Sequence, residues 1–138
     1  MAELKRISIS LEKNLLSRFD RQANRQGYPT RSEAVKALMR QNLVEQEWAQ
    51  NQEVAGAISI VYDHHRRGLT NRVTDVQHRF CPVIVSTQHV HLDHSYCLEI
   101  VVVRGKAGQI QKLAAALRSV KGVKHNALVM TTVGRDVG

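Results

Sequence analysis

Residues 83–103 read VIVSTQHVHLDHSYCLEIVVV, and this stretch decides the fold of the second half of the chain. Two runs rich in β-branched residues, 83–92 and 96–103, flank the short polar segment Asp93-His94-Ser95. This pattern predicts two antiparallel strands that are joined by a tight turn. We therefore expect a β-hairpin over residues 83–103.

Two histidines and a cysteine fall on one face of this hairpin. His89 and His91 are two residues apart, and side chains two apart along a strand point to the same side. A turn at 93–95 would place Cys97 directly opposite His91, with His89 one diagonal step away. Two imidazoles and a thiolate so close together suit a soft transition metal. We expect His89, His91 and Cys97 to bind such an ion.

The segments around the hairpin complete a ferredoxin-like sheet. Residues 54–62 and 123–133 have the apolar, β-branched composition of strands. Apolar residues at helical spacing precede the hairpin as far as Pro82 and follow it as far as Gly122. The order βαββαβ predicts one sheet with both helices on the same face.

Side-chain parity divides the predicted hairpin into two faces. Its even positions, which include Val90, Leu98 and Ile100, are apolar, and we expect them to meet the helices. Its odd positions combine the candidate ligands with Val101 and Val103. This second face is too apolar for water and no helix remains for it, so we expect another subunit to cover it.

His78 lies in the helix that precedes the hairpin, on the side opposite the apolar stripe Leu69, Val73, Val76 and Phe80. It therefore points away from its own core. We expect either a fourth metal ligand that is given to a neighbouring chain or a solvated histidine.

Glu99 and two arginines also allow alternatives. Glu99 shares the ligand face, where it could accept the second N–H of a ligand histidine or form a salt bridge at an interface. Arg66 and Arg67 begin the helix after the first strand of this domain. They could reach phosphates of a nucleic acid, or they are a solvated charge pair.

The first fifty residues have a different pattern. Residues 4–11 alternate between apolar and polar side chains, as in a half-buried strand, and two amphipathic helices follow. This is too little core for a stable domain, and a lone strand leaves both edges unpaired. Pairing with the same strand of a second chain would give an antiparallel ribbon that fits the DNA major groove. Its outward face would carry Arg6, Ser8 and Ser10 as base-contacting residues, unless this is an ordinary solvated edge.

Composition agrees with an intracellular nucleic-acid-binding protein. The 138 residues carry a net charge of +8, which favours an anionic partner. The chain contains no apolar run long enough to span a membrane, and two cysteines make a disulfide framework unlikely, so we expect the cytoplasm of a prokaryotic cell. The predicted fold class is α+β, with a DNA-binding domain at 1–50 and a metal-binding domain at 51–138.

These motifs resemble a known family of regulators. The N-terminal part, with its Arg6-Ile7-Ser8-Ile9-Ser10 strand, resembles ribbon-helix-helix proteins. The whole chain resembles NikR-type nickel-responsive repressors, in which an ACT-like domain follows the ribbon-helix-helix domain. The matching residues are Tyr62-Asp63-His64, Gln77-His78, His89-Val90-His91 and Cys97-Leu98-Glu99-Ile100.

The resemblance implies a homotetramer that binds a double-stranded DNA operator and is not an enzyme. It implies Ni(II) in a square plane of His89, His91, Cys97 and the partner's His78. It also implies Tyr62, His64, Gln77 and Glu99 as residues around the ligands.

The residues themselves leave the metal open. Three imidazoles and a thiolate suit nickel, copper, zinc or cobalt, so a zinc or copper sensor on this scaffold is an alternative. An antitoxin-like module that binds DNA and a protein is another. Two positions depart from the family: Ser8 and Ser10 replace common threonines, and Ala37 replaces an acidic residue that in some members helps to bind a cation near Glu33.

Overall fold

The computed structural model describes residues 2–138, which divide into two compact units between residues 39 and 40. This division falls within helix α2 (Arg31–Ala49), so the last turns of α2 belong with the second unit. The domain boundary that we expect at 50/51 stays a prediction. Each unit is described by itself below.

The first unit contains α1 (Lys13–Arg25) and the beginning of α2. Gly27 ends α1 with a positive φ of 84°, which a residue without a Cβ adopts at little cost. The backbone N–H of Tyr28 donates to the carbonyl of Ala23, and that of Gly27 donates to Asn24. These two bonds form a Schellman motif, in which Gly27 is the residue that ends the helix.

Thr30 caps the start of α2. Its Oγ1 accepts a hydrogen bond of 3.1 Å from the backbone N–H of Glu33. The carboxylate of Glu33 accepts from Lys36 at 3.2 Å. Arg31 holds the corner between the two helices through two hydrogen bonds to Asp20, at 3.0 and 2.7 Å.

Residues 2–12, which contain the predicted recognition strand, form neither helix nor strand in this single chain. Ile7, Ile9 and Leu11 are exposed by 60%, 65% and 51%. A single chain cannot form this strand, because the backbone hydrogen-bond partners of the strand were expected from a second copy of the chain. A ribbon therefore requires a dimer.

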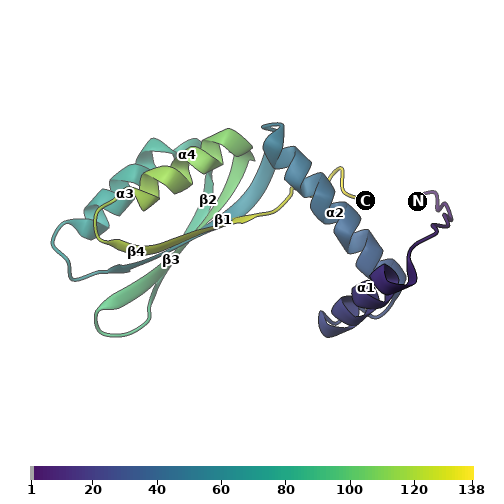
Figure 1. Ribbon diagram of the computed structural model, residues 1–138. Helices are drawn as coiled ribbons and strands as arrows, with labels where there is room; N and C mark the ends of the chain where they lie inside the picture. The colour runs from purple at the N-terminus through teal and green to yellow at the C-terminus, as the bar shows by residue number, and fades with distance from the viewer. Residues whose placement is uncertain (1) are drawn as a thin grey trace. The chain divides into compact units, whose positions relative to one another are not determined.

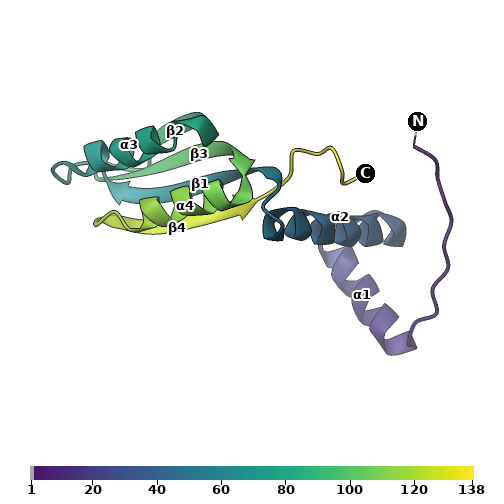
Figure 2. The ribbon, with the colours of Figure 1, turned by 90° about the horizontal axis from the view of Figure 1, so that it is seen from above.

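The second unit has an α+β fold, in which helices pack on a β-sheet (Figure 1). Its elements are β1 (Glu53–Asp63), α3 (Leu69–Arg79), the short 3-10 turn η1 (Cys81–Val83), β2 (Ile84–His91), β3 (Tyr96–Lys106), α4 (Ala107–Arg118) and β4 (Val123–Met130). The antiparallel sheet has the order β2-β3-β1-β4. Both helices cover the same face of it (Figures 1 and 2). The predicted βαββαβ arrangement is confirmed.

The predicted assignment of the two sheet faces is wrong. Val101 and Val103, at odd positions, have no exposed surface and pack in the core with the helices. Val90 and Val102, at even positions, are 37% and 39% exposed on the other face. The face that carries the candidate ligands is therefore the helix-covered face of its own chain.

Strand β1 explains this outcome. Its bulky residues Ile58, Ile60 and Tyr62 are fully buried, whereas the alternate positions are smaller or polar. In the antiparallel register Tyr62 pairs with Cys97 and Ile60 with Glu99, so the odd positions of β3 share the buried face of β1. Within the hairpin alone both faces are apolar, and only β1 distinguishes them.

The outer face of the sheet is open in the single chain. Its large exposed apolar side chains include Val90, Leu92, Val102 and Val129, with exposed fractions between 37% and 59%. An apolar sheet face of this kind is typical of an interaction surface. We therefore expect another subunit to cover the face that carries the even positions, and not the face that carries the odd positions.

The last turns of α2 join the core of the second unit through Trp48. Its side chain is 5% exposed, packs in the core cluster, and donates from Nε1 to the carbonyl of Thr131 at 2.8 Å. Among residues 2–138, no helix is sufficiently long and apolar to cross a membrane.

Candidate metal centre

The β2–β3 hairpin positions three of the predicted ligands. His91 pairs directly with Cys97, as the sequence predicted. Asp93 stabilises the turn, because its Oδ1 accepts hydrogen bonds of 2.8 Å from the backbone N–H groups of Ser95 and Tyr96. The imidazole rings of His89 and His91 lie 5.3 Å apart between centroids. The hairpin therefore presents two imidazoles and a thiol from one small region.

His89 is oriented by Glu99, which faces it across the two strands. The Nδ1 atom of His89 lies 3.1 Å from Oε1 of Glu99, and the Glu99 side chain is 8% exposed. A carboxylate only accepts hydrogen bonds, so this contact favours the tautomer with the proton on Nδ1. The Nε2 atom then keeps its lone pair for a metal ion.

The carboxylate of Glu99 has two further partners. The hydroxyl of Tyr62 donates to Oε1 at 3.1 Å, and the side-chain amide of Gln77 donates to Oε2. Burial, followed by the charge of Glu99, raises the pKa of Tyr62 far above its usual range, so this phenol remains a donor. Glu99 is thus a hydrogen-bonded buried carboxylate within the chain, which favours the first of the two roles that we expected for it.

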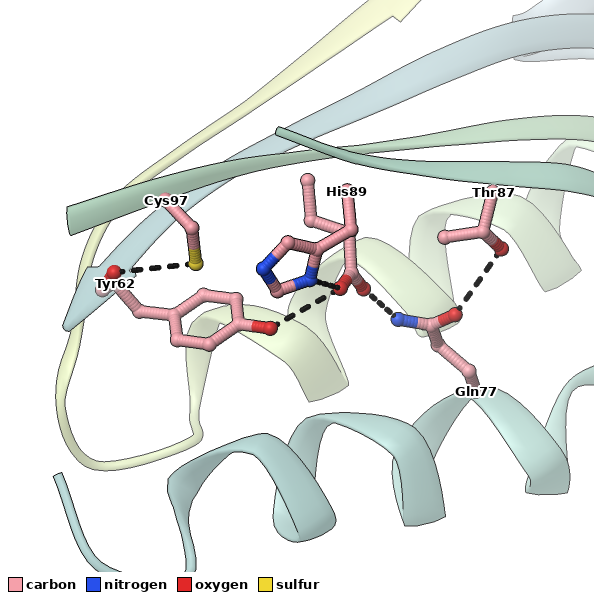
Figure 3. Close-up of polar contacts among 6 residues, drawn as sticks. Tyr62, Gln77, Thr87, His89 and Cys97 are labelled. Atoms are coloured by element: carbon pink, nitrogen blue, oxygen red, sulfur yellow. Dashed lines mark hydrogen bonds and ion pairs between the residues drawn. The ribbon is translucent and has the colours of Figure 1, made fainter. Parts of the chain in front are cut away.

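Gln77 reaches this carboxylate from α3, and Thr87 of β2 contacts the amide of Gln77 (Figure 3). The Oγ1 atom of Thr87 donates to Oε1 of Gln77 at 3.3 Å. Thr87 was not among the site residues predicted from the sequence. The available signal was parity, because Thr87 is two residues before His89 and so lies on the same face of β2.

Cys97 is a free, fully buried cysteine. Its thiol donates to the backbone carbonyl of Tyr62 at 3.4 Å (Figure 3). Burial raises the pKa of the Cys97 thiol, so the group is protonated in the metal-free chain at neutral pH. A metal ion would have to displace this proton, because the thiolate is the ligand form.

His64 follows β1 and lies beside the hairpin ligands. Its ring stacks on that of His91 with centroids 4.4 Å apart and an interplanar angle of 5°. Burial, with the neighbouring His65 and His91, lowers the pKa of His64 and favours the neutral ring. Its Nδ1 atom is buried and has no hydrogen-bond partner among residues 2–138. The ring of His64 thus packs face to face against the ring of His91, one of the predicted ligands.

The fourth predicted ligand stands apart from the other three. His78 is exposed on α3, whose buried positions are Leu69, Val73 and Val76. This confirms that it points away from its own core. In the part of the chain from residue 2 onward, no three His, Cys, Asp or Glu side chains are gathered into a complete metal site. A single chain therefore supplies the donors without closing them around an ion.

The predicted DNA contacts are all exposed. Arg6, Ser8 and Ser10 belong to the extended N-terminal segment. Arg66 and Arg67 lie in the loop before α3 and not within the helix as we expected, because α3 begins only at Leu69.

The chemistry of the donors fits nickel. Imidazole nitrogen and thiolate sulfur are ligands that Ni(II) accepts, and Glu99 leaves the Nε2 atom of His89 available. Cys97 and His91 occupy directly paired positions, so both can reach one ion from adjacent strands. His89, His91 and Cys97 therefore present their donor atoms on the same face of the sheet.

Comparison with known proteins identifies both parts of the chain. Residues 55–131 match the family model of the NikR C-terminal nickel-binding domain, and residues 5–46 match that of the ribbon-helix-helix proteins of the CopG family. Part of the chain is also similar in fold to an uncharacterized protein from Thermotoga maritima, with a TM-score of 0.51 over 56% of this chain and 96% of that chain, at 18% identity. This last likeness concerns the fold alone.

Two curated relatives match nearly the full length, and both carry names that describe nickel-responsive regulators. The protein from Syntrophus aciditrophicus is 50% identical over 98% of this chain and 98% of its own. The protein from Chlorobium limicola is 52% identical over 97% of this chain and 100% of its own. The chain is therefore a member of the nickel-responsive regulator family, a family of ribbon-helix-helix regulators and not of enzymes, with Ni(II) as its metal.

Proposed function

We propose that this protein is a transcriptional repressor that binds its DNA operator when nickel is present. The genes under its control would belong to nickel uptake or nickel homeostasis, and the protein would act in the cytoplasm. The observation that carries this proposal is the contact between His89 and Glu99, which prepares a ligand nitrogen on the same face as His91 and Cys97.

The proposed ligands are His89, His91 and Cys97 of one chain and the partner's His78. Nickel, when bound, supplies an electrostatic bridge between two subunits. Within the chain, Glu99 holds the tautomer of His89, Tyr62 and Gln77 hold Glu99, and His64 supports His91.

We propose a homotetramer in which two kinds of apolar surface are covered. The exposed residues Ile7, Ile9 and Leu11 would pair the N-terminal segments into a ribbon. The open sheet face around Val90 and Val102 would be covered by the regulatory domain of another subunit.

The ribbon would read the operator through Arg6, Ser8 and Ser10 in the major groove. Arginine pairs well with guanine, and serine hydroxyls can donate or accept at base edges. Arg66 and Arg67 would contact phosphates, since both are exposed and positively charged. Such contacts strengthen binding without reading sequence.

Nickel can switch such a protein only if it binds the DNA-competent arrangement more tightly than the others. A gel-shift titration tests this directly. We expect the affinity for operator DNA to rise with nickel concentration and the rise to disappear in His89→Ala and Cys97→Ala. Constant affinity across the titration would exclude the switch.

The gel shift, combined with an absorption spectrum, also distinguishes a nickel sensor from a sensor of another metal. Nickel in a square plane with a thiolate ligand absorbs visible light, whereas zinc does not. Loading with each metal in turn, followed by an absorption spectrum and a gel shift, would reveal a zinc or copper sensor if one of those ions gave the larger change in DNA affinity.

A further inference from the structure

Thr87 and Gln77 form a connection between β2 and α3 that the ligand set does not require. Gln77 extends from α3 toward the sheet, Thr87 lies at one end of its amide, and Glu99 accepts from the other end (Figure 3). Both contacts are made by one side chain. Its orientation is therefore decided by two partners.

The chemistry of these partners allows only one amide orientation. Glu99 is a carboxylate and can only accept, so the NH2 group of Gln77 must face it. The carbonyl oxygen of Gln77 then faces Thr87, whose hydroxyl donates at 3.3 Å. A flipped amide would set two acceptors against each other.

The connection also joins two ligands that belong to different ions in the proposed assembly. Glu99 holds Nδ1 of His89 at 3.1 Å, and His78 directly follows Gln77 in α3. The turn of α3 that carries His78 is therefore tied to the strand that carries His89.

We propose that Thr87 is a positioning residue of the metal centre, because its hydroxyl fixes the Gln77 amide and thereby ties His89 to the turn of α3 that carries His78. This inference rests on the ligands assigned under the proposed function. As a consequence, His89 and His78 of one chain, which bind different ions in the proposed assembly, keep a fixed position relative to each other.

A simpler role for Thr87 is strand preference, since threonine is common in β-strands. Valine has the same shape and an equally good strand preference, but it has no hydroxyl. Thr87→Val therefore removes the hydrogen bond alone, and Thr87→Ser restores the hydroxyl. Thr74→Val, at an exposed position of α3, is the matched control.

The first measurement uses metal-free, full-length protein labelled with ¹⁵N. The side-chain amide protons of Gln77 donate to Glu99, and Thr87 donates to the amide oxygen. We expect these protons to exchange with solvent about fivefold faster in Thr87→Val than in wild type, because an amide that has lost its bond to Thr87 turns away from Glu99 more often. Thr87→Ser and Thr74→Val should match wild type. Equal exchange in wild type and Thr87→Val would overturn the inference.

The second measurement is nickel affinity by competition with a chelator. We expect about a fivefold loss in Thr87→Val, which is less than the loss typical of a direct partner of a ligand. In a Gln77→Leu background the same substitution should cause no additional loss, because Thr87 acts through Gln77. A full additional loss there would contradict the inference.

Failure of the proposed function has a different signature. If wild-type protein did not bind nickel through His89 and Cys97, the metal role of Thr87 would be overturned with the ligand assignment. The exchange of the Gln77 amide is measured without metal. It would still show whether Thr87 holds Gln77.

Discussion

The Nδ1 atom of His89 lies 3.1 Å from a carboxylate oxygen of Glu99, a residue that is itself 6% exposed. Burial of a carboxylate is costly unless it is hydrogen-bonded, and here Tyr62 and Gln77 also donate to it. The arrangement therefore determines which nitrogen of His89 is available before any metal arrives.

Replacement of Glu99 by glutamine tests this relationship. Glu99→Gln preserves size but removes the charge and offers an NH2 group that competes as a donor. We expect nickel affinity to fall by roughly 10–100-fold, the usual effect of losing a partner of a metal ligand. Chelator competition measures the affinity, and an unchanged value would show that Glu99 does not orient His89.

Arg6 should separate DNA binding from metal binding. Arg6→Ala removes a proposed contact to a guanine edge, so we expect the affinity for operator DNA to fall about tenfold or more. Nickel affinity should stay unchanged, because Arg6 lies outside the metal-binding part of the chain. Lys124→Ala removes an exposed positive charge from the second unit. It is the control for a nonspecific electrostatic loss of DNA affinity.

Trp48 should matter for stability. It is 5% exposed, packs in the core and donates to Thr131 at 2.8 Å. Trp48→Ala should lower the free energy of unfolding by about 3–5 kcal/mol, as large-to-small core substitutions do. Urea denaturation of metal-free protein measures the change. A loss below about 1 kcal/mol would contradict this packing.

The hairpin turn should be sensitive to acid through Asp93. Hydrogen bonds from the backbone N–H groups of Tyr96 and Ser95 hold the pKa of Asp93 below its ordinary value of 3.8. A carboxyl group with a depressed pKa stabilises the folded state above its unfolded pKa, and this contribution is lost as the pH falls through the folded pKa. We expect the amide signals of Ser95 and Tyr96 in NMR spectra to show a shift as the pH falls below the ordinary pKa of Asp93. Asp93→Asn should abolish that shift.

Much of the fold follows from local pattern. The hairpin, the turn at 93–95 and the pairing of His91 with Cys97 could be predicted, because strand periodicity and a short polar turn fix a register. The caps at Gly27 and Thr30 also have local chemical causes, because each depends on residues only a few positions away in the chain.

The sheet faces could not be assigned from the hairpin itself. Both of its faces are apolar, and the deciding information lies in β1, where Ile58, Ile60 and Tyr62 are the bulky side chains. Pairing between β1 and β3 was needed to transfer that information to Cys97 and Glu99. Tertiary contacts of this kind are also the reason why the contact of Thr87 with Gln77 was missed.

In the proposed assembly each nickel site takes His78 from one subunit and His89, His91 and Cys97 from another. Mixing two inactive variants, His78→Ala and Cys97→Ala, tests it most directly. A mixed oligomer contains interfaces at which all four wild-type ligands meet. We predict that co-refolded protein regains the visible nickel–thiolate band that neither variant shows alone. Absence of that band in a mixture shown to contain both chains would contradict the account.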